Sequence, residues 1–166
     1  MNFSGYIKPK FNEIFVTKNQ SVKDLSAAVV KAINESVPQV DRVKWYFNKG
    51  NKTNNFKHTF DFTKKNIQYN REPSSAQTVK TFARMVGDKN KQGDCKHYTI
   101  CNASILLSLG YPVTLKMVSF NYFDKEPKHI YVVCQGIVFD CCMNYLGQEC
   151  AYKHAEYIDL KPINKN

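Results

Sequence analysis

Cys95 follows Gly93 and Asp94 and stands at the start of a stretch whose apolar residues recur at helical spacing. A thiol at the N-terminus of a helix lies at the positive end of the backbone dipole, which favours the thiolate, the reactive form. Gly93 permits a sharp turn and lets a substrate approach the backbone. We therefore predict that Cys95 is a nucleophile. Cys101, six residues further along the helix, is expected to be a buried structural cysteine.

His129 and Asp140 lie on two predicted strands that Gln135-Gly136 joins. If this dipeptide is a two-residue hairpin turn, Tyr131 pairs with Asp140 and His129 pairs with Cys142. Asp140 is then a diagonal neighbour of His129 on one face of the sheet, with Cβ atoms roughly 7–8 Å apart. A carboxylate that binds one ring nitrogen fixes the histidine tautomer and leaves the other nitrogen for the thiol. A register shift of one residue would separate the two side chains.

These residues occur within longer stretches that resemble a known family. The stretches are Gly93-Asp94-Cys95, LLSLGYPV (106–113), His129-Ile130-Tyr131-Val132-Val133 and a strand that ends at Asp140. Together they resemble the transglutaminase-like branch of the papain-type cysteine superfamily. The segments FTKKNIQYNREP (62–73) and QTVKT (77–81) are similar to the lead-in of short bacterial and phage-encoded members. The resemblance covers about residues 20–145. It implies a catalytic triad of Cys95, His129 and Asp140, with the cysteine at a helix N-terminus and the other two on adjacent strands.

The chain departs from the family pattern at two positions. His97 stands where short members often carry an acidic residue, and Cys141 follows Asp140 where a proline is common. We expect His97 to point away from Cys95 and to lie on the surface. Trp45 is expected to be a core anchor.

The implied chemistry is acyl transfer, in which a cysteine thiolate attacks the carbonyl of a peptide bond or of a glutamine side chain. His129 would protonate the departing amine and then activate water or an incoming amine. The oxyanion donor stays open among the backbone N–H of Cys95 and the side chains of Gln92 and Gln77. The scheme needs no cofactor.

The elements that must position these residues follow from apolar periodicity and from turn residues. Helices are predicted at about 21–38, with Ser21 as N-cap and Pro38 closing the helix, and at 53–67, 76–87 and 95–109. In the second of these, the expected buried side comprises Phe56, Phe60, Phe62 and Ile67. Strands are predicted at 113–122, 128–134 and 137–142. This order indicates an α+β fold in which a nucleophile helix packs on an antiparallel sheet, after N-terminal helices. The expected organisation is an extended arm at 1–20, one domain at 21–160 and a tail at 161–166.

The net charge of +10 comes from 21 Lys and only 3 Arg against 14 acidic residues. The planar guanidinium of arginine donates two hydrogen bonds at once to phosphates and bases, which lysine does not. This lysine-rich composition therefore does not favour specific binding of nucleic acid. The charge is uneven, with a net of +9 in residues 1–90 and of +1 in residues 91–166. A basic N-terminal half suits an acidic partner or a solvated surface.

All six cysteines lie in the second half of the chain, at positions 95, 101, 134, 141, 142 and 150. The sequence has no C-x-x-C pair and no secretion signal, so we expect neither a disulfide framework nor a metal site. Most of these cysteines are expected to be small buried hydrophobic residues. No stretch approaches the roughly twenty apolar residues of a membrane span. The expected location is the cytoplasm or a phage particle.

Three classes of function remain open at this point. The first is a cysteine-dependent acyltransferase or peptidase whose partner is a protein or peptide with an amide carbonyl. The second is a structural protein of a phage particle or of its assembly. Such a protein would retain the fold with little or no catalysis, and neighbouring subunits would hold its N- and C-terminal tails. The third is a basic module that associates with nucleic acid. Compatible spacing of all three triad positions favours the enzyme.

Overall fold

The computed structural model describes residues 3, 5–7, 22–73, 76–87 and 91–162. The predicted cap at Ser21 lies outside these residues, as do most of the arm at 1–20 and of the tail at 161–166. Helices and strands alternate irregularly along the described chain. In order they are α1 (Val22–Asp41), α2 (Lys44–Phe47), α3 (Lys52–Asn66), β1 (Gln68–Tyr69), α4 (Phe82–Gly87), β2 (Gln92–Gly93), α5 (Cys95–Ser108), β3 (Val113–Ser119), β4 (His129–Cys134), β5 (Ile137–Phe139) and β6 (His154–Leu160).

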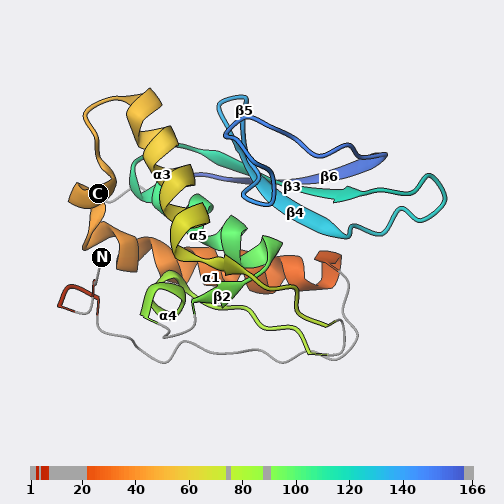
Figure 1. The fold of residues 1–166 in the computed structure, drawn as a ribbon, viewed down its shortest axis with the longest axis horizontal. Coiled ribbons are helices and arrows are strands. Elements are labelled where there is room, and N and C mark those ends of the chain that lie inside the picture. Colours follow the sequence, from red (N-terminus) through yellow and green to blue (C-terminus); the bar gives the residue numbers. More distant parts are fainter. Residues whose placement is uncertain (1–2, 4, 8–21, 74–75, 88–90, 163–166) are drawn as a thin grey trace.

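Four strands form an antiparallel sheet in the order β5-β4-β3-β6. The short strands β1 and β2 form a separate parallel pair, and β2 directly precedes α5 in the chain. Helices cover one face of the larger sheet, with α5 between α1 and the strands (Figure 1). The predicted α+β class is therefore confirmed, including the packing of the helix that begins at Cys95 against an antiparallel sheet.

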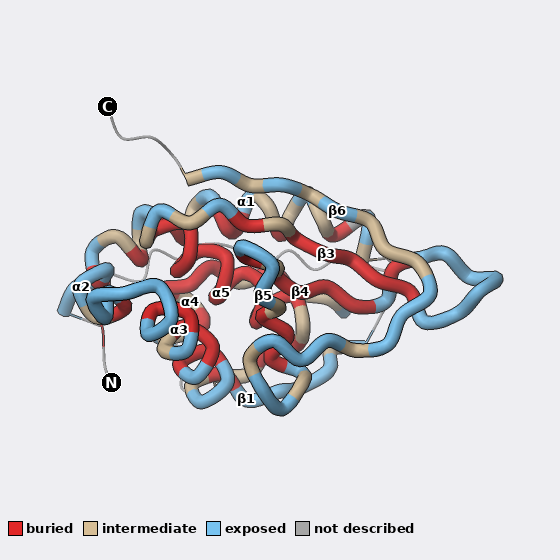
Figure 2. The backbone as a smooth tube through the Cα atoms, turned by 90° about the horizontal axis from the view of Figure 1, so that it is seen from above, coloured by how far each residue is buried: buried red, intermediate tan, exposed pale blue. Residues whose placement is uncertain are grey.

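Helix α5 lies at the centre of the molecule, and every residue from Lys96 to Ser108 is buried. A helix that is buried on all sides is expected to lack a polar face, and its few polar side chains must find partners inside. Figure 2 shows this buried centre running through α5, β3 and β4, while the connection between β3 and β4 projects as an exposed tip. The cysteine at the start of α5 is thus fixed by a rigid core element.

Three predicted elements, at 53–67, 95–109 and 128–134, form within one residue of their expected ends, which is the usual scatter of helix and strand boundaries. The expected buried side of the second helix, now α3, is confirmed at all four positions. The helix expected at 76–87 is shorter and begins only at Phe82. The strands expected to reach 122 and 142 end at Ser119 and Phe139.

Further features of the fold also differ from the prediction. Pro38 does not close the first helix, which continues through it to Asp41. A proline inside a helix costs roughly 3 kcal/mol, and the burial of Val37, Val40 and Val43 around it offsets this. Strand β6 was not predicted, since its side chains are exposed or half-buried and include two acidic residues. Full seven-residue pairing with β3 produces it as an edge strand.

Among the described residues, no helix has both the length and the apolar character needed to cross a bilayer.

Candidate active site

The polypeptide turns into α5 at Asp94, whose backbone is extended, and Cys95 is the first residue of the helix. The N–H groups of a first helical turn have no carbonyl partner within the helix, so they point toward whatever lies at its N-terminus. Cys95 is half-buried, unlike the remainder of α5. Its thiol is therefore at the one end of the helix that meets solvent.

His129 and Asp140 meet on one face of the sheet. Val133 pairs with Val138 and Val132 with Phe139, which is the predicted hairpin register. Asp140 follows the last residue of β5, and its Oδ2 lies 2.9 Å from His129 Nε2. Both side chains are largely removed from solvent, and the Asp140 carboxylate is 1% exposed. A hydrogen bond at Nε2 leaves Nδ1 as the ring nitrogen for a second partner.

The Cys95 thiol is the other group that raises the pKa of the His129 ring. Burial of the ring lowers the pKa of His129, but hydrogen bonds to Asp140 and to Cys95, and their negative charges, outweigh this effect. The pKa rises to about 10, so the ring is an imidazolium at neutral pH. The structure thus places His129 and Asp140 in direct contact, with the Cys95 thiol near enough to raise the pKa of the imidazole.

Two polar side chains of α5 fix the helix against the strands that carry His129 and Asp140. The Thr99 hydroxyl lies 2.9 Å from the carbonyl oxygen of Cys95 and 3.0 Å from that of Ile130, next to His129. One turn further on, Asn102 Nδ2 lies 3.4 Å from the carbonyl oxygen of Phe139 and 3.3 Å from Cys141 Sγ, on either side of Asp140. The helix that supplies the thiol therefore also anchors the backbone beside both partners. Neither Thr99 nor Asn102 was singled out from the sequence.

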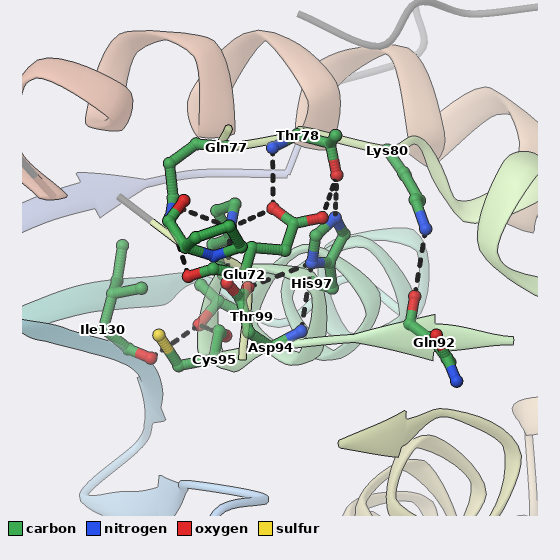
Figure 3. A network of polar contacts seen from close by, with 12 residues as sticks. Glu72, Gln77, Thr78, Lys80, Gln92, Asp94, Cys95, His97, Thr99 and Ile130 are labelled. Atoms are coloured by element: carbon green, nitrogen blue, oxygen red, sulfur yellow. Dashed lines mark hydrogen bonds and ion pairs between the residues drawn. The ribbon is translucent and has the colours of Figure 1, made fainter. Parts of the chain in front are cut away.

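A buried ionic network supports the start of α5 from the other side (Figure 3). Lys96 Nζ donates to Glu72 Oε2 and to Gln77 Oε1, each at 2.8 Å, and to Asp94 Oδ2 at 2.5 Å. The Lys96 side chain is only 5% exposed. Burial raises the pKa of Asp94, but hydrogen bonds and charges of His97 and Lys96 lower it to about 2. Buried charges of this kind are tolerated only when they are paired, so the network fixes where the helix begins.

His97 is a buried residue and not the surface residue expected from the sequence, since it is fully shielded from solvent. Its Nδ1 lies 3.1 Å from the backbone nitrogen of Asp94 and 3.0 Å from Asp94 Oδ1, and its Nε2 lies 3.5 Å from the Thr78 hydroxyl. The third residue of a helix can fold back over the N-terminus in this way. His97 and Cys95 project to opposite sides of the helix start, and the sulfur faces the strand of Ile130 (Figure 3).

Gly93 is required by the close approach of His97. A Cβ at position 93 would lie 2.6 Å from His97 Cβ and 2.9 Å from its Cγ. These contacts are far below van der Waals separation, so a side chain here must displace the imidazole or the backbone.

Gly93→Ala is therefore expected to destabilise the protein by about 1–3 kcal/mol, the usual cost of overpacking a core. Gly87→Ala is the matched control, since a Cβ at position 87 meets nothing within 4 Å. Urea unfolding of both variants measures the difference. A Gly93→Ala variant as stable as Gly87→Ala would show that the contact with His97 does not constrain the helix start.

Neither side chain considered as an oxyanion donor is placed for that role. Both protons of the Gln77 amide are used, because Nε2 lies 3.1 Å from the carbonyl oxygen of Glu72 and 2.9 Å from that of Pro73. Gln92 lies at the opposite end of the network from Cys95 (Figure 3), where its Oε1 accepts from Asn70. The backbone N–H of Cys95 is the donor that the local geometry leaves.

Cys101, Cys134 and Cys141 are buried, as expected for structural cysteines, and burial raises the pKa of the Cys101 thiol to about 12. Cys142 is exposed and Cys150 is half-buried, so the expectation that most cysteines are buried is only half right. Trp45 is 53% exposed, with its ring edge against Tyr6 and Tyr46, so it is not the core anchor expected.

Two aromatic rings pack against the His129 ring, that of the half-exposed Phe120 and that of the buried Tyr131. The Phe120 ring stacks on the His129 ring at 6.3 Å between centroids, and the Tyr131 ring lies 5.5 Å away. Phe120 begins the projecting connection between β3 and β4, where Tyr122 and Phe123 are also exposed, the latter at 96%. An apolar surface therefore adjoins the imidazole on its solvent side.

Comparison of the chain with family models, with curated proteins and with solved structures finds no match.

Proposed function

We propose that this protein is a cysteine-dependent acyltransferase or amidase in which Cys95 is the nucleophile, His129 the general acid and base, and Asp140 the residue that orients the imidazole. The observation that carries the proposal is the hydrogen bond of 2.9 Å between His129 Nε2 and Asp140, on a ring whose pKa the Cys95 thiol also raises. A nucleophile bonded to a base that a third group orients is the arrangement on which covalent catalysis depends.

The reaction would begin with attack of the Cys95 thiolate on an amide carbonyl carbon. The new C–S bond gives a tetrahedral intermediate whose oxyanion accepts from the backbone N–H of Cys95. The C–N bond then breaks, and the imidazolium of His129 gives its Nδ1 proton to the departing amine. The products of this half-reaction are a thioester on Cys95 and a free amine or ammonia.

The second half-reaction returns the enzyme to its starting state. Water or a primary amine attacks the thioester, and neutral His129 takes up its proton at Nδ1. The C–S bond breaks, the acyl group leaves as an acid or as a new amide, and the thiolate and imidazolium are restored. Asp140 keeps the ring in one tautomer throughout.

We also propose that the fold is the transglutaminase-like core that the sequence resembles. Support comes from the order of elements, in which a helix carrying the nucleophile precedes adjacent antiparallel strands with histidine and then aspartate. The substrate would be a protein or peptide, since the exposed aromatic rings beside His129 suit an extended chain with apolar side chains.

Selective alkylation tests the nucleophile. Loss of hydration at the sulfur is the largest cause that raises the pKa of each of the other five thiols, which are Cys101, Cys134, Cys141, Cys150 and also Cys142, although Cys142 as a whole residue is exposed. These thiols are mostly protonated at neutral pH, whereas Cys95 has an imidazolium beside it. We expect iodoacetamide at one equivalent to modify Cys95 at least about tenfold faster than any other cysteine in the native protein.

Peptide mapping by mass spectrometry gives the site, and acyl transfer is assayed in the same samples. Activity should fall in proportion to the alkylation of Cys95. Cys142 is the critical comparison because it is the exposed thiol nearest the site. Faster alkylation of Cys142, or full alkylation of Cys95 without loss of activity, would contradict the assignment.

A second candidate function is a role in a structural assembly, and one observation favours it. Large aromatic side chains on the β3–β4 connection are exposed, including Phe123, which is a surface of the kind that partner proteins cover. Two results together would support this candidate instead. The wild-type protein would be inactive toward broad peptide pools, and the Cys95→Ala variant would function normally.

A further inference from the structure

Two groups of side chains in the described part of the chain place three metal-ligating atoms close together. In one group, single ligand atoms of His129, Asp140 and Cys142 all lie within 4.8 Å of one another. The other group consists of Glu72, Asp94 and His97. The second group already holds a cation, since the Lys96 ammonium bonds two of its carboxylates. A metal ion there would have to displace a buried ammonium.

We propose that His129, Asp140 and Cys142 form a binding site for Zn²⁺, and that the bound ion inhibits the acyl transfer proposed above. One imidazole nitrogen, one carboxylate oxygen and one thiolate are the ligand types that zinc prefers. Zinc–ligand bonds of about 2.0–2.3 Å are compatible with ligand atoms a few ångströms apart, so only small side-chain shifts are needed.

Local structure holds Cys142 in reach of the other two ligands. Its backbone N–H donates to Asp140 Oδ1 at 3.1 Å, which folds the chain back on itself just after β5. This bond occupies one carboxylate oxygen, and the other oxygen faces His129. Lys64 secures the same turn by donating to the carbonyl oxygens of Cys141 and Met143 at 3.1 and 2.6 Å. Cys142 is exposed, which gives an ion a path from solvent.

Three ligands from a protein leave one position of a tetrahedral zinc ion open to water. The sequence alone did not indicate this site, because the ligands lack the C-x-x-C spacing of common zinc motifs. They meet only because the hairpin register places His129 beside the turn at residues 140–142.

The inhibition follows from where the metal would bind and rests on the proposed function. A zinc ion on His129 Nε2 takes the place of the proton that Asp140 holds there. The zinc-bound imidazole of His129 could then give its Nδ1 proton to a departing amine only by becoming an imidazolate. It would release this proton far less readily than an imidazolium does, because an imidazolium returns to neutral imidazole. Zinc would also occupy the carboxylate that orients the ring.

The binding claim is tested on the reduced, chelator-treated full chain with Co²⁺, whose thiolate charge-transfer absorption reports a cysteine ligand. Zn²⁺ affinity is then measured by calorimetry and by displacement of the cobalt. We expect one equivalent to bind, and affinity to fall by about 10–100-fold or more in Cys142→Ala and in His129→Ala. Cys95→Ala should keep both the affinity and the absorption, since Cys95 is not a ligand.

Cys150→Ala is the control, because Cys150 also neighbours Asp140 but lies outside the three-ligand group. Its affinity for Zn²⁺ should match that of the wild type. Equal affinity in wild type and Cys142→Ala, or loss of binding in Cys150→Ala alone, overturns the site.

The inhibition is tested separately, so that its failure is distinct from failure of the proposed catalysis. Zn²⁺ should inhibit the wild type reversibly, with activity restored by a chelator, at the concentration that saturates the measured site. Each variant is compared with its own metal-free rate, and Cys142→Ala should require at least about tenfold more Zn²⁺. A protein that binds Zn²⁺ through Cys142 but keeps full activity overturns the inhibition, whereas a protein inactive without metal counts against the catalysis only.

Discussion

Cys95→Ala is expected to abolish acyl transfer while leaving the fold intact. Loss of the nucleophile in enzymes of this chemistry lowers kcat by about 10⁴–10⁶-fold. The same change removes one sulfur atom from a half-buried position at a helix end, so the free energy of unfolding should fall by less than about 1–2 kcal/mol. The measurement pairs amine incorporation into glutamine peptides with peptide hydrolysis, beside urea unfolding.

His129→Ala serves as the companion variant, and its activity should fall to a similar floor because the two groups act as a unit. Cys101→Ala is the matched control, since it removes a thiol from the same helix without touching the site. Activity in Cys95→Ala above about one per cent of wild type, with the protein folded, would exclude Cys95 as the nucleophile.

The largest stability effect is expected from Lys96→Met. This change leaves the buried Asp94 and the half-buried Glu72 without the ammonium that both carboxylates bind. Removal of one partner from a buried ionic network typically costs about 3–5 kcal/mol, because an uncompensated charge remains. Since Asp94 and Lys96 flank Cys95, activity should fall as well.

Lys57→Met is the control for loss of a lysine as such. Lys57 pairs with Asp61 on the surface of α3, where the two side chains are 71% and 52% exposed. Pairs of this kind contribute less than about 1 kcal/mol to stability. The free energy of unfolding should therefore fall several-fold more in Lys96→Met than in Lys57→Met. Equal destabilisation by the two changes would show that the Lys96 network does not secure the helix start.

The hairpin was the part of the site that the sequence predicted best. Gln135 and Gly136 both have positive φ, at 48° and 79°, which is the geometry of a tight two-residue turn. Once that turn is fixed, strand alternation decides which residues share a face. The contact of His129 with Asp140 therefore followed from local chain geometry.

The surroundings of Cys95 were beyond such reasoning because they depend on contacts distant in sequence. Glu72 meets Lys96 across 24 residues, and Thr99 meets Ile130 across 31. His97 was misplaced because helical spacing alone puts it on a different side from Cys95, but does not reveal that the chain before Gly93 covers that side.

Capture of the acyl-enzyme intermediate tests the central claim most directly. Wild-type protein is mixed with an excess of a glutamine-containing peptide pool, quenched in acid and analysed by intact mass and peptide mapping. We expect an acyl adduct on Cys95 alone, which neutral hydroxylamine removes as it does a thioester and which Cys95→Ala does not form. An adduct on another residue, or turnover of peptides without any adduct on Cys95, would contradict it.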